Sequence, residues 1–224
     1  MISDLQKPIV SGFGQKTEPN EILSGIDLVG KSIIVTGGYS GIGLETTRAL
    51  KNAGARVIIP AKRVDVAIDQ LHGVVDKADI VEMDLGDLNS VQNFANSFNE
   101  QNIALDILIN NAGIMACPET RINKEWESQF AVNQIGHFLL TRELMDSMKK
   151  AKESRLVSLS SSAHSISGII WDDIHFKANP YDKWIAYGQS KTASSLLAIE
   201  FNRLMNDHGG KGFAVHPGGI MTPL

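Results

Sequence analysis

Cysteine is almost missing from this sequence: Cys117 is the single one among 224 residues. A lone cysteine excludes an internal disulfide, and no group of cysteines and histidines has the spacing of a zinc site. Long apolar runs are missing too, since none approaches the roughly 20 residues that span a bilayer. Polar residues such as Asp4 and Lys7 near the start argue against a secretion signal. We therefore predict a cytoplasmic protein with no metal site and no membrane span.

An excess of basic charge is also lacking, because the formal net charge is −4. Without a basic field, nucleic acid and anionic lipid surfaces are not expected partners. Hydrophobic residues make up 43% of the chain and charged residues 21%, which is typical of a globular protein with a substantial core. A chain of this length fits one large domain better than two small ones.

From Lys31 onward, short apolar segments alternate with longer segments of helical periodicity. The expected strands are Ser32–Thr36, Arg56–Pro60, Ile80–Met83, Ile107–Asn110, Arg155–Leu159 and Phe213–His216. The expected helices are Ile42–Ala53, Val64–Leu71, Asn89–Gln101, Glu125–Lys150 and Trp184–Asn206. Continuous apolar strands indicate a parallel sheet covered on both faces, so repeated β-α units predict a doubly wound, Rossmann-type α/β fold. Residues 1–30 lack this pattern and are expected to form an N-terminal arm before a single domain over 31–224.

A glycine-rich turn, Thr36–Gly43, lies between the first expected strand and the first expected helix. Glycines let the backbone approach a pyrophosphate closely, and the free N–H groups at a helix start carry partial positive charge. The stretch is therefore suited to bind a dinucleotide, although by itself it is also consistent with an ordinary turn.

The last expected helix contains a tyrosine, Tyr187, and a lysine four positions later, Lys191. This spacing places both side chains on one helix face. A neighbouring ammonium favours the phenolate, so we expect Lys191 to lower the pKa of Tyr187 toward the range of a general acid/base. An accidental pair on an amphipathic helix is the alternative for these two residues taken alone.

Other polar residues follow expected strands, at the sheet edge where ligands of parallel α/β proteins bind. Ser160, Ser161 and Ser162 follow one strand, and Asn110-Asn111-Ala112-Gly113 ends another. A serine hydroxyl there can donate a hydrogen bond to a carbonyl or alkoxide, and the serines lack the Gly-x-Ser-x-Gly pattern of hydrolases. Asp84-Leu85 and the loop His216–Thr222 follow two further strands.

Asn133 lies on the apolar stripe of the helix expected at Glu125–Lys150. A buried amide is costly unless it is hydrogen-bonded, so Asn133 has either a specific task or a satisfied structural role. The other members of that stripe are Trp126, Phe130, His137, Leu140, Leu144 and Met148. A second apolar strip, with Val132, Ile135, Phe138 and Leu139, predicts contact with a partner subunit.

Together these motifs resemble the short-chain dehydrogenase/reductase family, and in particular its retinol-dehydrogenase-like branch. The resemblance rests on Thr36-Gly37-x-x-x-Gly41-x-Gly43, Asn110-Asn111-Ala112-Gly113, Asn133, Ser160-Ser161-Ser162-Ala163-His164, Tyr187-x-x-x-Lys191 and Pro217-Gly218, in that order. It implies an enzyme that interconverts an alcohol with a ketone or aldehyde. The implied catalytic residues are Tyr187 as acid/base, Lys191 as its modulator and ribose ligand, Ser161 (with Ser160 and Ser162 as fallbacks) as carbonyl-orienting group, and Asn133 as holder of a relay water.

The implied cofactor is a nicotinamide dinucleotide. The residues expected to bind it are Gly37, Tyr39, Ser40, Gly41, Ile42, Gly43, Lys62, Arg63, Asp84, Leu85, Asn110, Ala112, Gly113, Tyr187, Lys191, Pro217, Gly218, Ile220 and Thr222. NAD enzymes usually place an acid after the second strand, whereas this chain has Lys62 and Arg63 there. Such cations favour a 2′-phosphate, so NADP(H) is expected in preference to NAD(H).

The substrate and the assembly are less closely defined by the sequence. Apolar residues between Ser161 and Tyr187, including Ile166, Ile169, Ile170, Trp171, Phe176 and Trp184, suggest a lipophilic carbonyl or alcohol substrate. We expect a homodimer through the helices over 125–150 and 184–206. Family members usually continue past the last strand with a lid, a helix and a final strand, so this chain is expected to be an abbreviated form or a fragment.

Two other functions are consistent with parts of the pattern. A non-catalytic NADP-binding sensor or assembly subunit would keep the glycine turn, but would have little need of all four catalytic-type residues. A sugar-nucleotide epimerase or dehydratase shares the fold, but typically spaces its glycines differently and has a larger C-terminal domain.

Overall fold

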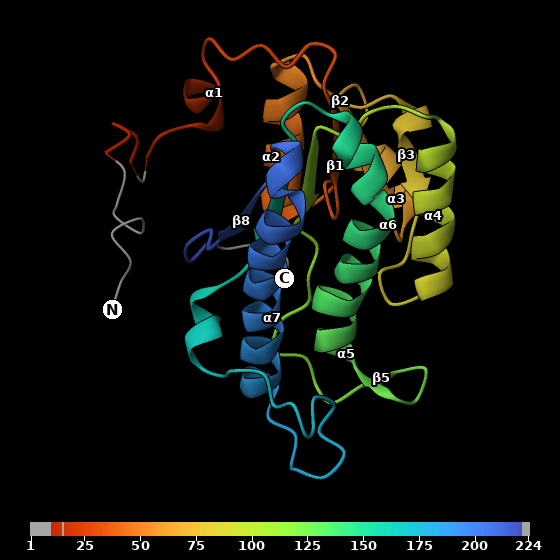
Figure 1. Cartoon of the computed structure of the whole chain (residues 1–224), viewed down its shortest axis with the longest axis vertical. Coiled ribbons are helices and arrows are strands. Elements are labelled where there is room, and N and C mark those ends of the chain that lie inside the picture. Colours follow the sequence, from red (N-terminus) through yellow and green to blue (C-terminus); the bar gives the residue numbers. More distant parts are fainter. Residues whose placement is uncertain (1–9, 15, 221–224) are drawn as a thin grey trace.

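Six parallel strands form the central sheet of the protein, in the order β3-β2-β1-β4-β7-β8. A computed structural model describes residues 10–14 and 16–220, and Figure 1 shows its elements. The strands are β1 (Ser32–Val35), β2 (Arg56–Ala61), β3 (Ile80–Glu82), β4 (Ile107–Asn110), β7 (Arg155–Leu159) and β8 (Lys211–Val215). After β3 the chain crosses to the other side of β1, where β4, β7 and β8 are added in turn. The sheet is therefore doubly wound, as predicted.

Helices cover both faces of this sheet. The helices of the two layers are α2 (Gly41–Asn52), α3 (Val64–Gln70), α4 (Leu88–Glu100), α5 (Ser128–Phe130), α6 (His137–Lys150) and α7 (Lys183–Met205), while the short α1 (Pro19–Ile22) precedes β1. A π-helical segment, Ala131–Gly136, joins α5 to α6, and 3₁₀ turns span Lys77–Asp79, Ser162–Ser165 and Asn206–His208. None of the helices in the described part of the chain is both long and apolar enough to cross a bilayer.

The core consists of one apolar cluster on each face of the sheet. Successive side chains of a strand point to opposite faces, so Ile34 packs with α4, α6 and α7, whereas Ile33 and Val35 pack with α2 and α3. All three side chains are fully buried. This two-sided burial is the physical reason why the strands are apolar without polar alternation.

The helix expected at Glu125–Lys150 begins later than predicted. Trp126–Glu127 form the short strand β6, which pairs antiparallel with β5 (Arg121–Ile122). The Glu127 carboxylate accepts hydrogen bonds from the backbone N–H groups of Gln129 and Phe130, and this cap starts α5 at Ser128. Trp126 therefore leaves the predicted stripe, while the other stripe members, Phe130, Asn133, His137, Leu140, Leu144 and Met148, are buried.

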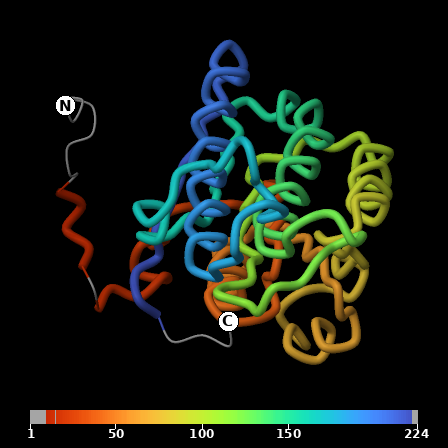
Figure 2. The backbone as a smooth tube through the Cα atoms, turned by 90° about the horizontal axis from the view of Figure 1, so that it is seen from below, coloured from red at the N-terminus to blue at the C-terminus, as the bar shows by residue number. Residues whose placement is uncertain are grey.

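The strand at the end of the chain also differs from its predicted bounds, since β8 begins at Lys211 rather than Phe213. It pairs with β7 alone in the described sheet, and most of its residues are exposed. The other strands, and the remaining predicted helices, agree with their expected bounds within one residue. The segment before β1 runs outside the layers (Figure 2), and Pro19, Ile22 and Leu23 line an apolar groove of about 560 Å³ against α2.

Candidate active site

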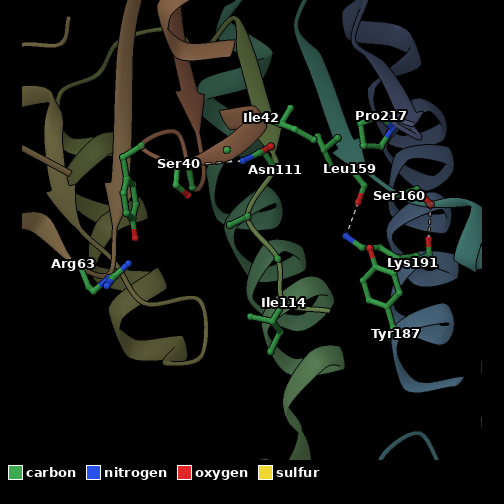
Figure 3. Close-up of a pocket in the computed structure, with 15 residues that line it drawn as sticks. Ser40, Ile42, Arg63, Asn111, Ile114, Leu159, Ser160, Tyr187, Lys191 and Pro217 are labelled. Atoms are coloured by element: carbon green, nitrogen blue, oxygen red, sulfur yellow. Dashed lines mark hydrogen bonds between the residues drawn. The ribbon is translucent and has the colours of Figure 1, made fainter. Parts of the chain in front are cut away.

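A cavity of about 310 Å³ opens at the carboxyl ends of the central strands. It is formed by loops that are far apart in the sequence, and Figure 3 shows ten of its residues labelled. The lining residues are Gly37, Tyr39, Ser40, Gly41, Ile42, Arg63, Asn111, Ala112, Gly113, Ile114, Leu159, Ser160, Tyr187, Lys191 and Pro217. The glycine turn thus lies on one side of the cavity and the Tyr/Lys pair on the other.

The glycine turn adopts backbone angles that side chains disfavour. Gly37 and Gly41 have φ values of +64° and +51°, in the left-handed region. A Cβ at Gly43 would overlap the carbonyl oxygen of Gly37, so Gly43 allows the first turn of α2 to pack onto the loop. The N-cap residue Ser40 makes no side-chain cap hydrogen bond. The first N–H groups of α2 therefore remain available to an anionic group.

A hydrogen-bonded contact joins the glycine turn to the loop after β4. The Thr36 hydroxyl accepts from the backbone N–H groups of Asn111 and Ala112, at 2.9 and 3.0 Å. The Asn111 amide donates back to the Thr36 carbonyl oxygen at 2.9 Å. These bonds hold two ligand-facing loops in one fixed relation.

Tyr187 and Lys191 lie one turn apart on α7, and both are largely buried. The Lys191 Nζ atom is 5.6 Å from the centroid of the Tyr187 ring and donates to the Leu159 carbonyl oxygen at 2.9 Å (Figure 3). Burial lowers the pKa of Lys191 to about 8, because a desolvated ammonium is disfavoured.

The expected lowering of the Tyr187 pKa does not occur in this structure. Burial raises the pKa of the phenol, and a hydrogen bond with the Ser161 hydroxyl lowers it by less. The ammonium of Lys191 lies over the ring and is bonded to a backbone carbonyl, so its charge is not directed at the phenol oxygen. Desolvation therefore dominates the titration of Tyr187.

The three serines after β7 differ in their environments. The Ser160 hydroxyl is buried and donates to the Lys191 carbonyl oxygen at 2.9 Å, which makes it a link between β7 and α7. Ser162 is exposed. Ser161 is partly exposed and accepts from the Ala163 N–H, and its hydroxyl is near enough to Tyr187 to oppose the rise of the phenol's pKa. Of the three serines, Ser160 lines the cavity.

Asn133 lies behind the cavity wall, in the π-helical segment, and is 2% exposed. Its side-chain oxygen accepts from the Ile114 N–H, and its amide donates to the Ile114 carbonyl and the Ser190 hydroxyl. The Ser190 hydroxyl in turn donates to the Tyr187 carbonyl oxygen. Asn133 thus ties the loop after β4 to the helix that carries Tyr187.

The basic residues after β2 are not equivalent. Arg63 lines the cavity, whereas the Lys62 ammonium forms an ion pair with the Asp84 carboxylate at 2.8 Å. The other Asp84 oxygen accepts from the Gly86 N–H. Lys62 and Asp84 therefore partly neutralise each other, and Arg63 is the basic residue of this pair that faces the cavity.

Some expected cofactor ligands lie outside the cavity lining. The Asn110 amide donates to the Thr141 hydroxyl on α6, and Leu85 packs into the core beside Gly136. Ile220 lines the groove beside α2 instead. Gly43 and Gly218 are not among the lining residues, and Thr222 lies outside the described residues.

The apolar segment between Ser161 and Tyr187 does not line this cavity. Ile169 and Trp171 instead line a separate apolar groove of about 370 Å³ on the outer face of α7. The Gln189 side chain holds the segment there, accepting from the Ile170 N–H and donating to the Ile174 carbonyl oxygen. Residues two apart on a helix point in nearly opposite directions, so Gln189 holds this segment away from Tyr187.

Several cavity residues were missed by sequence reasoning. Asn111, Ile114 and Leu159 line the cavity without having been predicted as ligands. A loop has no regular periodicity, so the sequence does not tell which of Asn110 and Asn111 points toward the cavity. His137 was placed only on an apolar stripe, although a histidine at a fully buried position indicates a hydrogen-bonding task.

Comparison with known proteins identifies relatives across most of the chain. The family model for short chain dehydrogenases matches residues 31–224. The chloroplastic short-chain dehydrogenase TIC 32 B of Brassica napus is 40% identical over 229 residues, covering 96% of this chain and 71% of that protein. Retinol dehydrogenase 13 of Homo sapiens is 37% identical over 200 residues, covering 87% of this chain and 60% of that protein.

Solved structures show the same fold. A crystal structure of a Mycobacterium paratuberculosis protein matches with a TM-score of 0.76 at 34% identity, covering 86% of this chain and 69% of that chain. RhlG of Pseudomonas aeruginosa, solved as an NADP complex, matches with a TM-score of 0.69 at 25% identity, covering 88% and 75%. With a family model that matches residues 31–224, and relatives well above 30% identity, the chain belongs to the short-chain dehydrogenase family of oxidoreductases and has retinol dehydrogenases among its relatives.

Proposed function

We propose that the protein is an NADP(H)-dependent oxidoreductase that interconverts an alcohol with a ketone or aldehyde. The observation that carries this proposal is the placement of Tyr187 and Lys191 beside one cavity whose opposite wall is the glycine turn. A proton-transfer group and a dinucleotide-type turn thus face the same space. Members of this family are oxidoreductases, and the finer assignment rests on this geometry.

The residues of the cavity fit a nicotinamide dinucleotide. The uncapped start of α2, with Gly37 and Gly41 in the left-handed region, offers N–H groups to the pyrophosphate. A Cβ at Gly113 would lie 3.2 Å from the Asn133 side-chain oxygen and 3.6 Å from Lys191 Nζ, so the absence of a side chain there keeps the space between this loop and Lys191 open. Lys191 would hold the ribose hydroxyls, and the bound cofactor would supply or accept the hydride.

The protein groups would then manage the proton and the carbonyl oxygen. The Ser161 hydroxyl donates a hydrogen bond to that oxygen and orients the carbonyl. Tyr187 donates its phenolic proton to the same oxygen during reduction and takes it back during oxidation. The phenol carries its proton at neutral pH, as the acid role requires, although burial makes it a weaker acid than a free phenol. Asn133 holds the loop at Ile114 and the Tyr187 helix in place.

The preference for NADP(H) is proposed from Arg63. Its guanidinium is exposed, lines the cavity and is positioned to pair with a 2′-phosphate. Lys62 contributes less because Asp84 already neutralises much of its charge. The NADP complex of RhlG, a structural relative, is consistent with this choice.

A homodimer is proposed from the outer faces of α6 and α7. Phe138, Leu196 and Ile199 are 47%, 45% and 63% exposed on these helices. With Trp171 they lie on or near the apolar groove described above. Helices with two apolar faces are typical of subunit contacts.

We further propose that residues 1–30 act as an arm to a catalytic domain over 31–224, and that the protein works in the cytoplasm.

The test of the proposed function is a substrate screen. Ketones, aldehydes and alcohols, apolar and polar, are offered to the purified protein with NADPH or NADP, and the 340 nm absorbance is followed. We expect turnover with at least one compound and faster turnover with the NADP pair than with the NAD pair. NADPH binding without turnover on any compound would favour a non-catalytic NADP-binding role instead.

A further inference from the structure

His137 is a fully buried histidine that no role described so far uses. It is the first residue of α6, directly after the π-helical segment, and is 2% exposed. Its Nδ1 atom lies 2.9 Å from the Asn133 carbonyl oxygen, and its Nε2 atom lies 2.9 Å from the Thr36 hydroxyl. Thr36 begins the glycine turn, while Asn133 lies behind the Tyr187 side of the cavity. The imidazole therefore spans the two sides of the site.

The hydrogen-bond partners determine the protonation form of this ring. The Thr36 hydroxyl already accepts from two backbone N–H groups, those of Asn111 and Ala112, which occupy both of its lone pairs. Its single proton must therefore be donated, and His137 Nε2 at 2.9 Å is a closer acceptor than the Ile109 carbonyl at 3.4 Å. The Asn133 carbonyl can only accept, so Nδ1 carries the hydrogen.

The charged form of the ring would not be satisfied at this position. An imidazolium has two N–H donors, and its Nε2–H would face a hydroxyl oxygen whose lone pairs are both taken. The ammonium of Lys191 adds further repulsion, and burial disfavours charge. The neutral ring with hydrogen on Nδ1 thus matches every neighbour.

The ring completes a continuous series of contacts across the site. Thr36 is bonded to the loop after β4, and His137 links Thr36 to the Asn133 carbonyl. The Asn133 side chain then bonds Ile114 and Ser190, and Ser190 bonds the Tyr187 carbonyl oxygen. A π-helical segment deviates from the regular helical register, so Asn133 depends on such side-chain contacts for its position.

We propose that His137, as the neutral ring protonated on Nδ1, is a positioning residue that holds Asn133 at a fixed position relative to Thr36. It keeps the glycine turn and the Tyr187 side of the cavity in one geometry. The inference rests on the proposed function for its role in catalysis. The hydrogen-bonding form of the ring and its effect on NADPH binding can be measured without any turnover.

The test uses variants that separate the two contacts of the ring. His137→Asn keeps a donor near the position of Nδ1 but removes the acceptor for Thr36, and His137→Phe removes both. Thr36→Val removes the hydroxyl and Thr36→Ser retains it. His208→Asn, at an exposed histidine in the 3₁₀ turn that follows α7, makes the same chemical change away from the site. Melting temperature and the NADPH dissociation constant are measured for each.

We expect His137→Phe, which removes both ring contacts, to lower the melting temperature and to weaken NADPH binding by about five- to tenfold. His137→Asn should recover most of the melting temperature but not the NADPH affinity. Thr36→Val also removes the acceptor for the Asn111 and Ala112 N–H groups, so it should weaken NADPH binding at least as much as His137→Asn does. The double variant Thr36→Val/His137→Asn should be no weaker than Thr36→Val alone. Thr36→Ser, which keeps the hydroxyl, should recover most of the NADPH affinity that Thr36→Val loses. His208→Asn should resemble the unmodified protein.

The ring form is measured directly by ¹⁵N NMR of protein labelled at histidine. The signal that disappears in His137→Asn should show a protonated Nδ1 and an unprotonated Nε2 from pH 8 down to pH 5. A charged ring, or hydrogen on Nε2, would overturn the inference. So would NADPH affinity in His137→Asn equal to that of the unmodified protein, or additive effects in the double variant. If the unmodified protein does not bind NADPH, the proposed function fails and the NMR result alone decides the inference.

Discussion

The Lys191 ammonium lies 5.6 Å from the centroid of the Tyr187 ring and donates its hydrogen bond to the Leu159 carbonyl oxygen. The pair is therefore not a direct ammonium–phenol contact. Lys191 is held by the strand that precedes the serines, and its own carbonyl oxygen accepts from the Ser160 hydroxyl. The position of the proposed cation beside Tyr187 thus depends on one junction between β7 and α7.

Replacing Tyr187 by Phe should remove turnover while leaving cofactor binding intact. The phenol is the only group in the proposed mechanism that moves a proton to the carbonyl oxygen, so its loss should lower kcat by about 10²- to 10⁴-fold. Steady-state kinetics and NADPH titration measure the two quantities. Turnover in Tyr187→Phe equal to that of the unmodified enzyme would contradict the assignment.

Replacing Lys191 by Met should stabilise the cofactor-free protein while removing activity. Burial lowers the pKa of Lys191 from 10.5 to about 8, which corresponds to a cost of about 3 kcal/mol at pH 7. Loss of the bond to Leu159 offsets about 1 kcal/mol of the gain. The cost of the lowered pKa is complete below pH 8 and disappears above pH 10.5, where Lys191 is neutral in both the folded and the unfolded state. The gain in unfolding free energy of Lys191→Met should therefore shrink between pH 8 and pH 10.5. Urea unfolding at several pH values measures it, and a less stable Lys191→Met at pH 7 would contradict it.

His137 should make the protein sensitive to mild acid. Its pKa is lowered from 6.5 to about 4, mainly by burial. Between these two pKa values the unfolded chain binds more protons than the folded protein does. The contribution of neutral His137 to the free energy of unfolding is therefore complete above pH 6.5 and is lost as the pH falls toward 4. The loss amounts to about 3 kcal/mol. Urea unfolding should show a flatter pH dependence for His137→Asn over this window. Parallel curves for the two proteins would contradict the prediction.

Arg63 and Lys62 should differ in their effect on cofactor choice. Arg63→Ala removes the cation that faces the cavity, so NADPH should bind about ten- to a hundredfold more weakly, with little change for NADH. Lys62→Ala should change either affinity far less, because Lys62 is paired with Asp84. Fluorescence titration with both cofactors compares the variants. If Arg63→Ala weakened the binding of NADPH and of NADH equally, Arg63 would not be the residue that binds the 2′-phosphate.

The apolar face of α6 and α7 should control the oligomeric state. Phe138→Glu or Leu196→Glu places a charge on this face and should convert a dimer to a monomer, because burying an unpaired carboxylate is costly. Val29→Glu introduces the same charge at an exposed position outside these helices and should leave the dimer intact. Sedimentation velocity measures the mass. A monomeric unmodified protein would refute the dimer.

Sequence reasoning located the elements well and their mutual contacts less well. The strand bounds followed from apolar segments, and the spacing of Tyr187 and Lys191 gave their shared helix face. The start of α5 was missed because the cap at Glu127 depends on a side chain folding back onto two N–H groups. The segment with Trp171 was expected beside the substrate, but Gln189 holds it on another face of α7.

Three features could be inferred from the amino-acid sequence: the doubly wound sheet, the glycine turn and the one-turn spacing of the Tyr/Lys pair. These features follow from periodicity and from the conformational freedom of glycine, which act within a few residues. Only the tertiary structure decided that Asn111 rather than Asn110 faces the cavity, that Lys62 pairs with Asp84, and that His137 joins Thr36 to Asn133. Thr36 and His137 are 101 residues apart. Local periodicity orients a side chain relative to its own element, whereas the partner that it meets depends on how distant elements pack.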